Sequence, residues 1–194
     1  MTHSVSSICV FCGSRPGTNP AYALAARHMG QVLAARGIRL VYGGGRVGLM
    51  GVLADAALAA GGRVVGVIPE ALLRLEVGHR ALTELHVVPN MHARKRMMAE
   101  LSDAFVALPG GIGTFEELFE VWTWRQLGYH GSPLGLLDVD GYYQGLLQFM
   151  GRTVGDGFLD PTQLGLLMVD TDSARLVERI AEAPRGPRLD LDQT

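Results

Sequence analysis

Short apolar runs alternate along the chain with longer stretches in which apolar residues recur every three or four positions. The short runs are typical of strands buried on both faces of a parallel sheet, and the longer stretches are typical of amphipathic helices. The predicted strands are Ser7–Cys12, Arg39–Tyr42, Arg63–Ile68, Glu84–Val88, Ala104–Leu108, Leu134–Asp138 and Leu166–Asp170. The predicted helices with clear bounds are Pro20–Arg36, Met91–Leu101, Thr114–Leu127, Tyr142–Thr153 and Ser173–Ala183.

This alternation of strands and helices predicts an α/β fold. We expect a Rossmann-like, doubly wound, mainly parallel sheet of about seven strands with helices on both faces. The chain of 194 residues has room for one sizeable core, so residues 1–183 are expected to form a single domain. Residues 71–83 are expected to form a loop over the sheet. Residues 184–194 are polar and contain proline, which predicts a flexible C-terminal tail.

The charge balance gives no electrostatic reason to expect a nucleic acid or a membrane surface as a partner. The net charge is −2 and the isoelectric point is near 6.3. The first residues lack a basic segment followed by an apolar one, and no apolar run approaches the roughly 18 residues of a membrane span. Cys9 and Cys12 have opposite phases on the first strand and are expected to be reduced core residues. The expected location is the cytoplasm.

The most informative stretch is the strand, turn and helix from Ala104 to Leu127. Pro109 ends the apolar run because proline cannot continue a ladder of hydrogen bonds, and Gly110, Gly111 and Gly113 then allow a tight turn close to a ligand. The start of the following helix offers N–H groups and the positive end of the helix dipole, which suit a phosphate. The stretch therefore predicts an anion-binding turn, although a glycine loop alone is a weak signal.

Carboxylates follow this glycine turn directly, at Glu116, Glu117 and Glu120. A simple phosphate site has no need of carboxylates, which would repel the ligand, so these residues indicate a chemical role. A structural interpretation stays open: with Thr114 as the N-cap, Glu117 falls at the third helical position and completes a capping box.

A second glycine turn follows the strand that ends at Tyr42. It comprises Gly43, Gly44 and Gly45, and with Gly48 it has the G-x-G-x-x-G spacing of dinucleotide-binding proteins. The next strand, however, lacks the acidic residue that would bind the ribose of NAD, so NAD is not expected. Ser14, in the loop after the first strand, is a further candidate ligand contact, although a solvated loop serine is the commoner case.

Arg94 is the cation best placed to accompany the carboxylates. On the helix that starts after Asn90, its expected N-cap, Arg94 shares one face with Met91, Met98 and Leu101. A charged group within an apolar stripe is unfavourable unless it meets an anion or lines a cleft. The alternative is an arginine that extends its charged end to solvent.

These stretches resemble the motifs of one known family. Pro109–Glu117, with the sequence PGGIGTFEE, is similar to the PGGxGTxxE motif of the LOG family. Members of that family are cytokinin-activating nucleoside 5′-monophosphate phosphoribohydrolases that were long labelled lysine decarboxylases. The resemblance extends in order from about Ile8 to Asp140, and the further matching stretches are Phe11–Ser14, Val41–Gly45, Val47–Gly51 and Met91–Lys95 with Met98.

The resemblance implies a nucleotide-binding domain and hydrolysis of the N-glycosidic bond of a nucleoside 5′-monophosphate to an adenine-type base and ribose 5-phosphate, without a metal or a cofactor. It implies that Arg94 and Glu117 are catalytic, as a cation and a carboxylate that stabilise charge on the leaving base and on the sugar. The implied substrate contacts are Glu76, Arg94, Lys95, Gly111, Ile112, Gly113, Thr114, Phe115, Glu116, Glu117 and Thr123. The remaining candidates for phosphate or nucleotide contact are Ser14, Gly43, Gly44, Gly45 and Gly110.

One implied contact disagrees with helix geometry. Thr123 lies six residues after Glu117, about 240° around a helix, so both side chains do not easily face one pocket. The helix Thr114–Leu127 is also apolar on nearly every side and carries Trp122 and Trp124, which favours an interface. We therefore expect a homodimer, as the resemblance also implies, and helix geometry suggests that Thr123 serves the neighbouring site. The alternative is a helix covered within its own domain.

Two other functional classes are alternatives. A pyridoxal-phosphate decarboxylase requires a Schiff-base lysine, and Lys95 is the single lysine among 17 basic residues, with no supporting motif. A non-catalytic carrier of a nucleotide or phosphate is the stronger alternative, because glycine turns bind without reacting. Such a carrier has no need of both Arg94 and Glu117.

Overall fold

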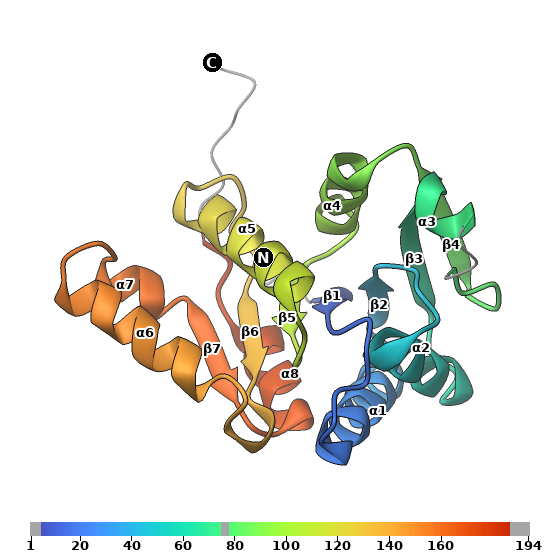
Figure 1. Cartoon of the computed structure of the whole chain (residues 1–194), viewed down its shortest axis with the longest axis horizontal. Helices are drawn as coiled ribbons and strands as arrows, with labels where there is room; N and C mark the ends of the chain where they lie inside the picture. The colour runs from blue at the N-terminus through green and yellow to red at the C-terminus, as the bar shows by residue number, and fades with distance from the viewer. Residues whose placement is uncertain (1–4, 75–77, 187–194) are drawn as a thin grey trace.

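Seven parallel strands form one sheet in the computed structural model, which describes residues 5–74 and 78–186 (Figure 1). The strand order is β4-β3-β2-β1-β5-β6-β7, and every recorded pairing is parallel. The strands are β1 (Ser7–Phe11), β2 (Arg39–Tyr42), β3 (Val64–Pro69), β4 (Glu84–Val88), β5 (Ala104–Ala107), β6 (Leu134–Leu137) and β7 (Leu167–Asp170). The predicted doubly wound α/β fold is confirmed.

Helices cover both faces of this sheet (Figure 1). They are α1 (Pro20–Ala35), α2 (Gly48–Ala59), α3 (Glu70–Arg74), α4 (Met91–Glu100), α5 (Ile112–Gln126), α6 (Gln144–Gly155), α7 (Pro161–Leu164) and α8 (Ser173–Glu182), with a 3-10 turn at Val139–Gly141. Helices α1, α2 and α8 pack on one face, and α4, α5 and α6 pack on the other, so that two apolar layers enclose the sheet.

The alternation of side chains along β1 feeds both layers. Ile8 and Val10 belong to the core under α1 and α2, and Cys9 and Phe11 belong to the core under α5. Cys9 and Cys12 lie in different layers, and both are buried free thiols, as the sequence predicted. Their separation by the sheet explains why they do not form a disulfide.

Three details differ from the sequence-based prediction. Helix α3 occupies part of the expected loop 71–83, of which residues 75–77 lie outside the described residues. Helix α5 begins at Ile112, two residues before the expected N-cap Thr114. At the C-terminal end, Gly186 N donates to Gly131 O at 2.9 Å, and residues 187–194 of the expected tail lie outside the described residues.

Trp122 is a core residue of the single chain. Its side chain is 3% exposed within the layer under α5, and its Nε1–H donates to Gln163 O at 3.0 Å. The interpretation of Trp122 as an interface residue was therefore wrong, because α7 and the sheet already cover it. Among the described residues, no helix is both long and apolar enough to cross a membrane.

Candidate active site

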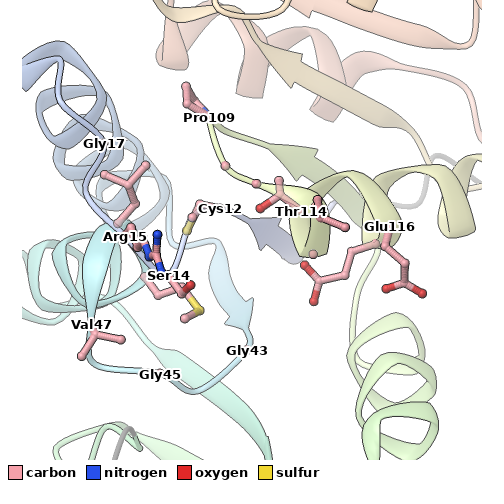
Figure 2. A pocket seen from close by; sticks show the side chains of 18 of the residues that line it. Cys12, Ser14, Arg15, Gly17, Gly43, Gly45, Val47, Pro109, Thr114 and Glu116 are labelled. Carbon is pink, nitrogen blue, oxygen red and sulfur yellow. The ribbon is translucent and has the colours of Figure 1, made fainter.

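A cleft of about 820 Å³ opens at the carboxyl ends of β1, β2 and β5 (Figure 2). The strand order reverses between β1 and β5, which is where ligands bind in open α/β sheets. The walls of the cleft come mainly from the loops after these three strands and from the starts of α4 and α5. The volume suits a small molecule of nucleotide size.

The glycine turn before α5 forms one wall of the cleft. Gly111 is the N-cap with extended backbone, φ −98° and ψ −155°, and no side chain caps the helix. The first N–H groups of α5 therefore have no acceptor within the helix. A Cβ on Gly110 would lie 2.1 Å from Thr114 Oγ1, whereas a Cβ on Gly111 or Gly113 would meet nothing within 4 Å. Internal packing requires glycine only at Gly110, and the space beside Gly111 and Gly113 is open to the cleft.

The alternative interpretation of Glu117, as part of a capping box with Thr114, is wrong. Because Gly111 is the N-cap, Thr114 occupies the third helical position, and Glu117 lies beyond the first turn. The Glu117 side chain lines the cleft instead, together with Glu116. Figure 2 shows Thr114 and Glu116 on α5, across the cleft from the loop that carries Ser14 and Arg15.

Glu117 is a half-buried carboxyl group that accepts no recorded hydrogen bond from the part of the chain that the structure describes. Burial raises the pKa of Glu117 to about 7, and the neighbouring charges of Glu116 and Glu120 add to this effect. Arg94 and Lys95 act in the opposite direction. A carboxyl group with such a pKa exchanges protons near neutral pH, which is the property of an acid–base or charge-stabilising catalyst.

Arg94 enters the cleft from α4. Asn90 caps this helix as expected, since its Oδ1 accepts from Ala93 N at 2.9 Å. Arg94 is 8% exposed, so the alternative of a solvent-directed arginine is wrong. Its Nη2 donates to Gly43 O at 3.1 Å, while its Nε is buried without a partner among the described residues. A donor left unpaired at the wall of a cleft is available to a ligand.

The second glycine turn makes room for this guanidinium group. A Cβ on Gly43 would lie 1.7 Å from Arg94 Nη2, so no larger residue fits while Arg94 keeps its position. Gly44 has φ +71°, in the left-handed region that favours glycine, and Gly45 lines the cleft. The turn therefore serves Arg94 and the cleft, which explains its glycines without a dinucleotide.

Lys95 joins the two helices that carry the charged groups. Its Nζ donates to Glu116 Oε1 and, at 3.0 Å, to Glu120 Oε1, and its side chain is largely covered. Although burial opposes the charged form, the hydrogen bonds from Lys95 to Glu116 and Glu120 raise its pKa. The group stays an ammonium ion at neutral pH, which disfavours a Schiff base at Lys95.

The cleft brings together most of the predicted site residues. These are Ser14, Gly43, Gly45, Arg94, Gly110, Gly111, Ile112, Gly113, Thr114, Glu116 and Glu117. Gly44, Lys95, Phe115 and Thr123 do not line the cleft: Phe115 packs edge-on against Tyr143, and Thr123 is exposed on another side of α5. Glu76 lies outside the described residues.

Sequence reasoning missed several residues of the cleft wall. Arg15 and Tyr142 are the polar ones, and Met50, Leu72 and Met91 add apolar surface. Arg15 directly follows Ser14, so its position in the loop after β1 could have indicated that it lines the cleft. Tyr142 comes from the connection between β6 and α6, and no local pattern links it to the glycine turn. In the described parts of the chain, no group of three metal-ligating side chains is placed to hold a metal.

The fold and the cleft define a class of protein. The chain is an α/β protein whose sheet has, at its switch point, a cleft with a free helix start, a buried arginine and a carboxyl group of raised pKa. The family model described as "possible lysine decarboxylase" matches residues 50–180.

Curated relatives extend over nearly the whole chain. A cytokinin riboside 5′-monophosphate phosphoribohydrolase of Rhodococcoides fascians is 50% identical over 182 residues, which are 93% of this chain and 90% of the relative. A protein of the same name from Arabidopsis thaliana is 47% identical over 183 residues, which are 94% and 86% of the two chains. This chain belongs to the LOG family, the phosphoribohydrolases that carry the older decarboxylase description.

Solved structures share the fold. A molybdenum cofactor carrier protein from Chlamydomonas reinhardtii matches with a TM-score of 0.69 and 25% identity, over 90% of this chain and 96% of the other. A molybdenum cofactor binding protein from Rippkaea orientalis matches with a TM-score of 0.68 and 22% identity, over 90% and 94%. The second likeness shows the fold alone.

Proposed function

We propose that the protein hydrolyses the N-glycosidic bond of adenosine 5′-monophosphates, including N6-modified ones, to ribose 5-phosphate and a free base, either a cytokinin or adenine. The observation that carries this proposal is the raised pKa of Glu117, about 7, in the same cleft as Arg94 and the free start of α5. The names of relatives at 47% to 50% identity support the same reaction.

The three parts of the site divide the reaction between them. The N–H groups at the start of α5 bind the 5′-phosphate and orient the ribose. Breaking the glycosidic bond builds positive charge on the sugar, which the Glu117 carboxylate stabilises while it positions the attacking water. Arg94, on the facing helix, holds the substrate and stabilises charge on the departing base.

Incubation with AMP and with isopentenyladenosine monophosphate tests this proposal. We expect chromatography to show free base and ribose 5-phosphate in equal amounts, without an added cofactor. Adenosine should react far more slowly, because the 5′-phosphate contributes binding energy that orients the reacting bond. A panel of nucleoside monophosphates from which no base is released would refute the proposal, and equal rates for AMP and adenosine would refute the role of the phosphate.

A carrier function is the second candidate, because the Chlamydomonas structure at 25% identity is titled a carrier protein. A carrier binds its ligand in the cleft and returns it unchanged. The same incubation separates the two functions: a carrier leaves AMP intact after stoichiometric binding, whereas a hydrolase consumes a large molar excess.

We also propose that the protein is a homodimer in the cytoplasm, where both buried thiols stay reduced. Leu127, 51% exposed at the end of α5, lies one helical turn from Thr123 and is the residue to test. Leu127→Glu should yield a folded monomer. A molecular mass near 20.8 kDa for the unmodified protein, measured by light scattering, would count against the dimer.

A further inference from the structure

Two consecutive tyrosines from the connection between β6 and α6 reach the glycine turn before α5. The Tyr143 hydroxyl donates to Leu108 O at 2.6 Å, and the Tyr142 hydroxyl donates to Gly110 O at 2.5 Å. Tyr143 is fully buried, whereas Tyr142 is 37% exposed and lines the cleft. The same short segment therefore holds the turn from its core side and from its cleft side.

The other carbonyl groups of the turn are also occupied. Pro109 O accepts from Gly13 N at 3.1 Å, and Gly111 O accepts from Phe115 N at 3.1 Å. Together with the two tyrosine bonds, every carbonyl from residue 108 to residue 111 has a donor. The N–H groups that follow, at the start of α5, have no acceptor within the helix. The turn thus offers donors to the cleft, and its acceptors are engaged elsewhere.

The tyrosine segment is itself held rigidly. Asp138, buried at the end of β6, accepts from Tyr143 N at 2.7 Å. The Tyr142 ring lies edge-on against Tyr143, at 4.9 Å between ring centroids, and against Tyr22 of α1, at 5.3 Å. The ring of Tyr142 is therefore fixed by packing, and this position directs its hydroxyl group to the Gly110 oxygen.

We propose that Tyr142 is a positioning residue for the hydrolysis, which occupies the Gly110 carbonyl and so prevents it from opposing the substrate's phosphate group. The inference rests on the proposed function. Without the hydroxyl donor, the Gly110 oxygen carries an unpaired partial negative charge next to the anion site and is free to turn toward it. Removal of the hydroxyl should therefore weaken every step in which the phosphate is bound, because a small misplacement of a binding group removes much of its contribution to affinity and rate.

Tyr142→Phe removes the hydroxyl and retains the packed ring, and Tyr22→Phe is the matched control. The Tyr22 ring touches the same ring, but its hydroxyl makes no recorded hydrogen bond within the described residues. We expect Tyr142→Phe to lower kcat/KM for AMP about tenfold and to weaken binding of ribose 5-phosphate, measured by calorimetry, by a similar factor. Adenosine binding and the melting temperature should change little, and Tyr22→Phe should match the unmodified protein.

A second variant loosens the segment without touching Tyr142. Asp140 has a left-handed backbone, φ +51°, and its Oδ2 accepts from Asn19 Nδ2 at 2.9 Å. Asp140→Gly releases that tether at a position glycine adopts easily, and should produce a smaller loss of the same kind.

Equal values for Tyr142→Phe and Tyr22→Phe in both assays would overturn the inference, as would equal losses with AMP and adenosine. A protein that binds ribose 5-phosphate but releases no base from AMP would refute the proposed hydrolysis. In that case the inference fails as a statement about hydrolysis, and calorimetry of the variants still decides whether Tyr142 positions the anion site.

Discussion

Two half-buried carboxyl groups lie at opposite ends of the sheet and differ in the hydrogen bonds that they accept. Asp103 precedes β5 at the amino end, and its Oδ2 accepts four hydrogen bonds from the backbone and hydroxyl groups of Ser6 and Ser7, at 2.7 to 3.0 Å. Its Oδ1 pairs with Arg185 at 2.5 Å. Glu117, at the carboxyl end, accepts none from the described chain.

The pKa values follow from these surroundings. Burial works against the charge of Asp103, but the hydrogen bonds from Arg185 and Ser6 hold its pKa well below the usual range. Burial dominates at Glu117 and raises its pKa to about 7. The amino end of the sheet satisfies its charges with the chain's own donors, whereas the cleft leaves a carboxyl group and the Nε of Arg94 for a ligand. Unsatisfied groups of this kind favour function at the expense of stability.

The two carboxyl groups should differ most in their effect on turnover. Glu117→Gln should retain the fold and lower kcat by about 10²- to 10⁴-fold, the usual cost of losing a positioned acid–base group. Asp103→Asn makes the same chemical change at the other end and should keep a rate near that of the unmodified protein at 25 °C. Release of base from AMP measures both. A Glu117→Gln variant with a near-normal rate would transfer the catalytic role to Glu116.

Displacing Arg94 without substituting it should have the next largest effect. The methyl group of Gly43→Ala would lie 1.7 Å from Nη2 and push the guanidinium group out of its place. We expect kcat/KM for AMP to fall about 10²-fold, because geometry and not charge is lost. Gly145→Ala on α6, where an added Cβ meets nothing within 4 Å, is the control and should not lower the rate. An active Gly43→Ala variant would argue that Arg94 is not held in its catalytic position.

Stability should respond to pH with opposite signs at the two carboxyl groups. Folding raises the pKa of Glu117, so its charge destabilises the fold as pH rises from about 4.5 through 7. Glu117→Gln should therefore be more stable than the unmodified protein at pH 8, by up to about 3 kcal/mol, and no more stable at pH 4. Thermal unfolding at both values measures the difference, and a constant offset would contradict the raised pKa.

Folding lowers the pKa of Asp103, so its contribution is present above about pH 4 and is lost as the pH falls below that value. Asp103→Asn should cost about 2 kcal/mol at pH 7, because charge-assisted hydrogen bonds from Ser6, Ser7 and Arg185 weaken. The cost should shrink in acid. A variant as stable as the unmodified protein at pH 7 would show that these bonds contribute nothing.

The fold was predictable because the β-strands are short and largely apolar, with β4 the most polar of them, and each long helix has an apolar face. The same regularity gave the boundaries of β2 and β4 without error and the others within a few residues. Short elements such as α3 and α7 leave too little periodic pattern to be recognised. Trp122 was misassigned because a helix that is apolar all round is buried in either case, and the sequence does not show that α7 covers it.

The site was predictable where its residues are adjacent in the chain. The turn Gly110–Thr114 and Glu117 form one local motif, and Arg94 was identified by its apolar neighbours. The helix start was misplaced because Thr114 is a good N-cap residue, yet its side chain packs over Gly110, which leaves the cap to Gly111. Tyr142 was missed because its contact with the turn joins residues 32 positions apart.

The charged neighbours of Glu117 should have a smaller effect on the reaction. The charge of Glu116 raises the pKa of Glu117, and the charge of Lys95 lowers it. If the Glu117 carboxylate is the active form, kcat/KM for AMP rises with pH and reports this pKa in the free protein. Glu116→Gln should therefore shift the rising limb to lower pH, and Lys95→Met should shift it to higher pH, whatever either change does to the maximal rate. Shifts in the same direction would contradict the opposite effects of Glu116 and Lys95 on this pKa. A rate that falls as the pH rises through 7 would mean that a protonated Glu117 carries the reaction.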